Sequence, residues 1–252
     1  MQTVMKKAAV IIPARFASTR FPGKPLVKIG GIPMIERVYR QATQCSDVSR
    51  ILVATDSDEI FDTVRSFGGD VVMTSPDCQS GTDRCAEVIS SREISEEIII
   101  NIQGDEPFIK PEQISELIRL MQPDHIEIGT LAKRITEQGS VFNPNVVKLV
   151  KASSGKALYF SRNPIPFVRG SDAEHWLDSA PFFKHIGLYG YKKEVLTKLA
   201  KLPVGDLEKA ESLEQLRWME AGYELYAAET EWESLGIDTP EDLEKAALFL
   251  KS

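Results

Sequence analysis

The chain has 252 residues, 42% of them hydrophobic, which is enough to bury a large core in one domain without disulfide support. Its net charge of -7 would repel a polyanionic backbone, so the composition argues against non-specific nucleic-acid binding. Any phosphate group that the protein binds must therefore meet a local cluster of basic side chains.

The cysteines and the first residues indicate where the protein resides. Cys45, Cys78 and Cys85 are odd in number and lack a CxxC spacing, which favours a reducing compartment over a disulfide framework, a zinc site or a catalytic thiol. The first apolar run ends at Pro13 and Arg15 without a cleavage pattern, so it predicts a strand and not a signal peptide. No stretch approaches the roughly 20 apolar residues that cross a bilayer, and the sequence predicts a soluble, cytoplasmic protein.

Strand-like and helical patterns alternate through the first half of the chain. This rhythm is typical of a parallel sheet with crossover helices and predicts a doubly wound α/β domain. The expected strand and helix pairs are 8–14 with 33–42, 50–56 with 59–67, 70–74 with 83–90, and 97–104 with 111–121.

The second half changes rhythm and predicts a mixed sheet that carries a lobe. Strand-like runs at 127–135, 145–152 and 185–192 are separated by looser, proline-rich segments. One amphipathic helix is expected over 207–222, followed by a strand at 223–229. No internal repeat or long linker interrupts the chain, so residues 1–252 are expected to form one continuous unit.

A basic loop follows the first expected strand. Arg15, Arg20 and Lys24 fall within residues 15–24, beside the turn-forming Gly23. In an open parallel sheet this loop leaves the carboxyl end of a strand, where ligands bind, and its cations could neutralise a triphosphate and a departing pyrophosphate. The alternative is a set of solvated surface charges. The loop matches neither GxxxxGK[ST] nor GxGxxG, which argues against the usual kinase and dinucleotide interpretations.

Acidic residues follow the strand at 97–104. Asp105 and Glu106 are adjacent, so only one of them is expected to face a ligand, and we choose Asp105. A carboxylate opposite a basic phosphate loop suits magnesium, which takes one or two carboxylates together with phosphate oxygens and water. Asp238 is the second candidate, although an Asp beside a helix start is commonly a capping or turn residue.

A third acidic motif spans Asp56, Ser57 and Asp58. It has the DxD form of the metal motif in many nucleotide-sugar-dependent glycosyltransferases. Here it ends the second expected strand and opens a helix, so helix capping is the simpler interpretation.

Motifs along nearly the whole chain resemble those of the 3-deoxy-manno-octulosonate cytidylyltransferases, within the sugar nucleotidyltransferase superfamily. The chain departs from the family pattern at Phe16 and Phe21, and at 207–212 ahead of the last sugar motif. The matching motifs are ARFASTRFPGKPL at 14–26, QSGTDR at 79–84, QGDEP at 103–107, ALYFSR at 157–162, HIGLYGY at 185–191, LEQLR at 213–217 and GIDTPEDLE at 236–244.

The resemblance implies a fold and a reaction. The fold is a doubly wound, mostly parallel mixed sheet flanked by helices, with a nucleotide-binding half at about 1–125 and a sugar-binding and dimerisation half at 126–252. The implied enzyme is a homodimer that uses Mg2+ and transfers CMP from CTP to an acidic octulosonate, for lipopolysaccharide synthesis.

The resemblance also assigns residues to the triphosphate and the metal. Arg15, Lys24 and Asp105 are implied in catalysis, and Arg15, Arg20 and Lys24 contact the triphosphate. Asp105 and Asp238 are the implied magnesium ligands.

Further positions are assigned to the two substrates in the same way. Gln79, Ser80 and Arg84 are implied around the cytosine and ribose. The implied sugar contacts are Gln103, Arg162, His185, Tyr189, Glu214 and Gln215, with Arg162 as the cation for the sugar carboxylate.

Three alternatives stay open at this point. The motifs do not separate the octulosonate from its 8-amino form or from another acidic sugar such as a nonulosonate. A more distant alternative is a glycosyltransferase that uses the motif at Asp56 to Asp58. The third is a nucleotide-binding protein without catalysis, against which the basic loop and both candidate metal ligands argue.

Overall fold

The computed structural model describes residues 5–17, 21–233, 236–237, 242–243 and 246 of the chain. Within these residues the chain forms one nine-stranded sheet, in the order β11-β7-β10-β6-β1-β4-β5 with β8 and β9 added beside β10, and a small β2–β3 pair. The strands are β1 (Ala8–Ala14), β2 (Lys28–Ile29), β3 (Ile32–Pro33), β4 (Val48–Thr55), β5 (Val71–Met73), β6 (Ile98–Asn101), β7 (Ile128–Arg134), β8 (Lys148–Lys151), β9 (Ala157–Ser161), β10 (Phe183–Lys192) and β11 (Leu225–Glu229).

Helices cover both faces of this sheet. Alternate residues of β1 enter different cores: Ile11 packs in one, and Val10 and Ile12 in the other. The first core also takes residues of α3, α7 and α9, and the second takes residues of α1, α2 and α4. The helices are η1 (Lys24–Leu26), α1 (Met34–Thr43), α2 (Asp58–Ser66), α3 (Gly81–Ser91), α4 (Pro111–Leu120), α5 (Gln138–Phe142), η2 (Ala173–His175), α6 (Trp176–Ser179), α7 (Lys193–Leu199), α8 (Asp206–Glu211) and α9 (Glu214–Glu220).

The strand directions determine which strand ends lie side by side. β1 runs parallel to β4 and β6, whereas β10 runs antiparallel to both β6 and β7. The carboxyl ends of β1 and β6 therefore lie at one edge, and loops from distant parts of the sequence meet there. The predicted mostly parallel mixed sheet flanked by helices is confirmed, as is the strand and helix alternation of the first half.

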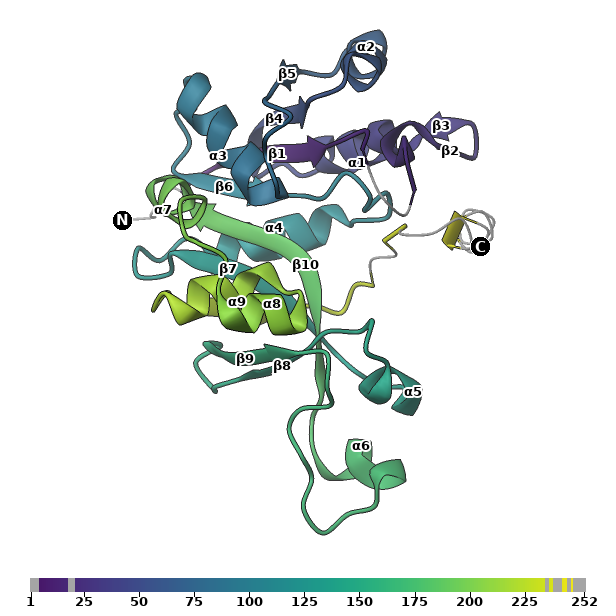
Figure 1. Cartoon of the computed structure of the whole chain (residues 1–252), viewed down its shortest axis with the longest axis vertical. Helices are drawn as coiled ribbons and strands as arrows, with labels where there is room; N and C mark the ends of the chain where they lie inside the picture. The colour runs from purple at the N-terminus through teal and green to yellow at the C-terminus, as the bar shows by residue number, and fades with distance from the viewer. Residues whose placement is uncertain (1–4, 18–20, 234–235, 238–241, 244–245, 247–252) are drawn as a thin grey trace.

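A lobe extends from the far end of β10 (Figure 1). It contains α5, η2 and α6, next to the β8–β9 hairpin. Its own small core packs Val141, Trp176 and Phe182, with the last two rings stacked at 5.9 Å between centroids. This lobe corresponds to the one predicted from the proline-rich segments of the second half.

The single helix predicted over 207–222 is wrong. The chain forms α8 and α9 instead, separated at Ser212, which has the left-handed values φ 52 and ψ 49. Hydrogen bonds from Arg162 to the carbonyls of Glu211 and Ser212 hold this break. The cause is a side chain just after β9, distant in the sequence, so hydrophobic periodicity could not reveal it.

Among the described residues, no helix is long and apolar enough to cross a membrane. The helix start expected beside Asp238 lies mostly outside the described residues.

Candidate active site

The basic loop leaves the carboxyl end of β1 and is closed by its own backbone. Gly23 adopts the left-handed φ of 68°, which favours glycine, and its N–H donates to the carbonyl of Phe16 at 3.0 Å. This turn starts η1 and buries most of Lys24, whereas Arg15 stays exposed. Arg20 lies outside the described residues.

Asp105 follows the carboxyl end of β6 and meets the basic loop. Lys24 Nζ lies 2.5 Å from Asp105 Oδ2. A Cβ on the neighbouring Gly104 would lie 3.0 Å from the carbonyl oxygen of Pro13, so the close approach of this residue to the end of β1 favours glycine there. The structure thus brings together the lysine predicted for the triphosphate and the carboxylate predicted for magnesium.

The chain ahead of the second predicted metal ligand also reaches this loop. The N–H of Ile237 donates to the carbonyl of Asp105 at 3.0 Å. Asp238 itself lies outside the described residues. Within the described part of the chain, no group of three or more His, Cys, Asp or Glu side chains is arranged to hold a metal ion. The hard carboxylate of Asp105 nevertheless fits magnesium, because this ion usually relies on few protein ligands and on substrate phosphates.

A pocket of about 90 Å³ lies between the end of β1 and the start of α3. Ser80 caps α3 by accepting from the N–H of Asp83 at 3.1 Å, and the Asp83 carboxylate accepts from the N–H of Ser80 at 3.0 Å. Four predicted site residues line this pocket: Arg15, Ser80, Arg84 and Gln103. Gln79 is exposed nearby, with its Nε2 donating to the carbonyl of Asp77 at 2.9 Å.

Arg84 is buried and held by side chains from neighbouring strand ends. Its guanidinium donates to Asp56 Oδ2 at 2.7 Å and to the hydroxyl of Thr74. Its contact with a nucleotide stays a prediction. Ser57 caps α2 by accepting from the N–H of Ile60, so the capping interpretation of the DxD motif is confirmed.

Two of the predicted sugar contacts, His185 and Tyr189, lie on β10. The ring of His185 shares a hydrogen bond of 2.9 Å with the hydroxyl of Thr130, and burial lowers its pKa to about 3. Tyr189 lies 5.3 Å from His185 and 5.2 Å from Trp218, measured between ring centroids. Burial therefore favours the neutral imidazole, and the contact of His185 with the sugar stays a prediction.

Glu214 and Gln215 begin α9, and Glu214 contacts the start of α3. The hydroxyl of Thr82 donates to Glu214 Oε2 at 2.9 Å. Burial raises the pKa of Glu214, although hydrogen bonds from Ser80 and Thr82 act in the opposite direction. Glu214 Oε1 and Gln215 Nε2 are buried without a hydrogen bond in the described structure. A buried polar atom without a hydrogen-bond partner destabilises the folded protein, and such atoms commonly mark a ligand site.

Arg162 has a different set of partners from the one expected of a cation for the sugar carboxylate. Its guanidinium donates to the backbone carbonyls of Pro144, Glu211 and Ser212. Its contact with the sugar stays a prediction, and its observed contacts hold the break between α8 and α9.

Sequence reasoning missed several polar residues that support the site. Thr82 holds Glu214, Asn101 Oδ1 accepts from Gln103 Nε2 at 3.1 Å, and Thr130 holds His185. Asn101 could have been found as the one polar residue that closes the buried run IIIN. Thr82 stands inside a matched motif, but nothing local to it indicates a partner on α9.

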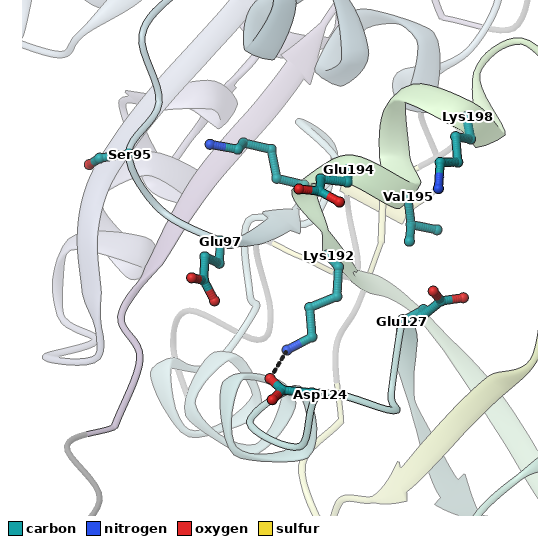
Figure 2. A pocket seen from close by; sticks show the side chains of 9 residues that line it. Ser95, Glu97, Asp124, Glu127, Lys192, Glu194, Val195 and Lys198 are labelled. Atoms are coloured by element: carbon teal, nitrogen blue, oxygen red, sulfur yellow. Dashed lines mark ion pairs between the residues drawn. The ribbon is translucent and has the colours of Figure 1, made fainter.

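A cavity of about 570 Å³ lies at the opposite edge of the sheet, near the amino ends of β6 and β7 (Figure 2). Its wall contains both acids and lysines, and the Lys192 ammonium points toward Asp124 at 3.9 Å. Lys192 and Lys193 also donate to the carbonyls of Met121 and Ile94. The predicted site residues do not line this cavity.

Comparisons with known proteins agree with this geometry. The family model described as Cytidylyltransferase matches residues 9–246. A 3-deoxy-manno-octulosonate cytidylyltransferase of Parabacteroides distasonis is 50% identical, with 98% of this chain and 99% of the relative covered. One of Cytophaga hutchinsonii is also 50% identical, over 92% of this chain and 93% of the relative. The solved structure of a CMP:2-keto-3-deoxy-manno-octonic acid synthetase complexed with CTP superposes with a TM-score of 0.89 at 41% identity, covering 97% of this chain and 98% of the other.

Proposed function

Because the chain belongs to the family of 3-deoxy-manno-octulosonate cytidylyltransferases, we propose that it transfers CMP from CTP to 3-deoxy-manno-octulosonate and releases pyrophosphate. The observation that carries this proposal is the contact of 2.5 Å between Lys24 and Asp105 at the carboxyl edge of the sheet. It supports the proposal because it brings the lysine proposed for phosphate and the carboxylate proposed for magnesium together at the edge where an open α/β sheet binds its ligands.

The reaction exchanges one P–O bond for another and releases a proton. The anomeric hydroxyl of the sugar attacks the α-phosphorus of CTP in line, the bond from this phosphorus to the pyrophosphate oxygen breaks, and the hydroxyl proton passes to solvent. Arg15 and Lys24 neutralise the negative charge that grows on this leaving group. Most of the rate enhancement then comes from positioning and from charge neutralisation, as in other phosphoryl transfers.

Asp105 and Asp238 are the residues that would hold magnesium. When bound there, the ion would neutralise phosphate oxygens and favour loss of the proton from the attacking hydroxyl. The hydrogen bond from Ile237 to the Asp105 carbonyl supports the pairing of these two loops.

The sugar would lie between β10 and the start of α9. Glu214 Oε1 and Gln215 Nε2 supply an acceptor and a donor that have no hydrogen bond within the described structure. The neutral His185 and the hydroxyl of Tyr189 would add further contacts to sugar hydroxyls. This set binds a polyhydroxylated sugar and does not distinguish the 8-hydroxyl from an 8-amino group.

We also propose that the enzyme is a homodimer, that it works in the cytoplasm where CTP is supplied, and that its product feeds lipopolysaccharide synthesis. Phe167 on the lobe is 76% exposed and lies edge-on to Trp176, with 5.3 Å between ring centroids. An exposed aromatic beside a small apolar core is typical of an interaction surface. Sedimentation of the wild type and of Phe167→Glu tests the dimer, which the proposal expects this substitution to weaken.

Pyrophosphate release from CTP and magnesium, with and without the octulosonate, tests the proposed reaction. UTP replaces CTP in one parallel assay, and the 8-amino sugar replaces the octulosonate in another. We expect release with CTP and the unmodified sugar, and no release with UTP. Pyrophosphate release with the amino sugar alone would identify that sugar as the substrate. No release with any acidic sugar would contradict the proposed reaction.

A further inference from the structure

The break between α8 and α9 has an unfavourable backbone conformation at its centre. Ser212 has φ 52 and ψ 49, and among the described residues it is the non-glycine residue with a positive φ. L residues other than Asn and Asp rarely adopt this conformation, because Cβ approaches the following carbonyl oxygen. Strained residues of this kind persist where the surrounding structure holds them, and they cluster at functional sites.

Arg162 is the side chain that holds this conformation from outside the helices. Its Nε donates to the carbonyl of Glu211 at 2.6 Å and its Nη2 to the carbonyl of Ser212 at 3.3 Å. Its Nη1 reaches the carbonyl of Pro144 at 3.1 Å. The planar fork thus joins the helix break to the loop before β8, a geometry that a lysine ammonium cannot reproduce.

Glu211 and Lys148 fix Arg162 in turn. The Glu211 carboxylate accepts from the hydroxyl of Ser161 at 2.6 Å and from the backbone N–H of Arg162 at 2.9 Å. The buried Lys148 ammonium donates to the carbonyl of Arg162, and also to those of Asn143 and Val146. Arg162 therefore donates hydrogen bonds to the carbonyls at the helix break, and the Glu211 side chain at this break accepts hydrogen bonds from the end of β9.

This arrangement determines where α9 starts. In one uninterrupted helix, Glu214 would lie on the same face as Ala210 and Glu211, because residues three and four apart are neighbours. The break instead lets Glu214 reach the hydroxyl of Thr82 at 2.9 Å and buries Gln215. The two buried polar atoms without a hydrogen bond, Glu214 Oε1 and Gln215 Nε2, belong to these residues.

We propose that Arg162 and Glu211 are positioning residues that hold residue 212 in its left-handed conformation and so present Glu214 and Gln215 to the acidic sugar. Arg162 then acts through the main chain, whereas the family resemblance assigns it to the sugar carboxylate. The proposal rests on the proposed function, because it takes Glu214 and Gln215 as sugar contacts.

Arg162→Lys separates positioning from direct charge pairing. This variant keeps the charge and loses the fork, so positioning predicts a KM for the octulosonate that rises roughly 10- to 100-fold, the loss that a misplacement of about 1 Å can cause. The KM for CTP should stay unchanged. Lys209→Ala, on the exposed side of α8, is the matched control and should behave as the wild type.

Ser212→Gly provides the rescue. Glycine adopts a positive φ without steric penalty, so the single variant should be near wild type, and the double variant Arg162→Lys, Ser212→Gly should recover much of the lost sugar KM. A lost direct contact cannot be restored by a glycine fifty residues away. Near-normal sugar KM in Arg162→Lys, or no recovery in the double variant, would overturn the proposal.

Hydrogen exchange of the α9 amides gives a readout without substrate. Positioning predicts faster exchange at 214–220 in Arg162→Lys and Glu211→Ala, and recovery of slow exchange when Ser212→Gly is added to Arg162→Lys. Unchanged exchange in both single variants would contradict the proposal even if the wild type proved inactive toward the octulosonate. Failure of this inference is thereby distinguishable from failure of the proposed reaction.

Discussion

The ammonium of Lys24 lies 2.5 Å from Oδ2 of Asp105, although the two residues are 81 positions apart in the chain. The contact joins the loop after β1 to the loop after β6, the two segments with the clearest phosphate and metal motifs. Binding of CTP with magnesium would replace this pair with two others: the lysine with phosphate, and the carboxylate with the metal. The ion pair between these two predicted site residues thus keeps both charges compensated at a partly buried site.

Asp105→Asn should abolish turnover and leave the fold intact. The amide preserves the shape of the side chain but loses the charge that a magnesium ligand needs, and we expect kcat to fall by at least about 10³-fold. Pyrophosphate release measures the activity, and circular dichroism with thermal unfolding checks the fold. Near-normal turnover in a folded variant would remove Asp105 from the metal role.

Thr82→Val should weaken the sugar site selectively. The substitution removes the hydroxyl that donates to Glu214 Oε2 at 2.9 Å and leaves this buried carboxylate less satisfied. We expect the KM for the octulosonate to rise about tenfold, equivalent to about 1.4 kcal/mol, with little change for CTP. Steady-state kinetics with each substrate varied in turn provides the measurement. An increase confined to the KM for CTP would contradict the placement of Glu214 at the sugar.

Glu214→Gln should change the pH dependence of stability. Burial raises the pKa of Glu214, so the folded protein binds this proton more readily than the unfolded chain does. The stabilisation is fully present below the unfolded pKa and is lost as the pH rises through the raised folded pKa. The neutral glutamine does not titrate, so its Tm should exceed that of the wild type most clearly at neutral and alkaline pH. Thermal unfolding measures the Tm of both proteins across the pH range. A higher Tm of the variant only at acidic pH would contradict the predicted direction of the pH dependence.

The ion pair between Asp56 and Arg84 should stabilise the fold, and the DxD motif that contains Asp56 should not bind a metal. Both side chains are largely buried, so Asp56→Ala leaves an uncompensated guanidinium and should lower the free energy of unfolding by about 3 kcal/mol. The matched variant Asp58→Ala removes the exposed acid of the same motif and should keep full cytidylyltransferase activity. Denaturant unfolding measures the first effect and pyrophosphate release the second. Loss of pyrophosphate release in a well-folded Asp58→Ala protein would contradict the capping interpretation of this motif.

The fold of the first half was predictable because its cause is local. Apolar runs such as Ala8–Ala14 supply residues to both cores, and each run is followed by an amphipathic helix. The break at Ser212 was not predictable, because Arg162 holds it from 50 positions earlier in the chain. A side chain that bonds distant carbonyls leaves no periodic signal in the sequence.

The candidate site was predictable to a similar extent. Motifs at the ends of β1 and β6 indicated Lys24 and Asp105, because parallel strands bring their carboxyl ends to one edge. The partners of the polar groups were not predictable. Thr82 reaches Glu214 across 132 positions, and the guanidinium of Arg84 is shared by Asp56 and Thr74.

Phosphorus NMR can follow the whole proposed reaction in one sample that contains the protein, CTP, magnesium and 3-deoxy-manno-octulosonate. We expect the CTP signals to disappear while inorganic pyrophosphate and one new phosphodiester, CMP linked to the sugar, appear together in equal amounts. Unchanged CTP, or its conversion to CDP and phosphate without a sugar phosphodiester, would contradict the proposed transfer.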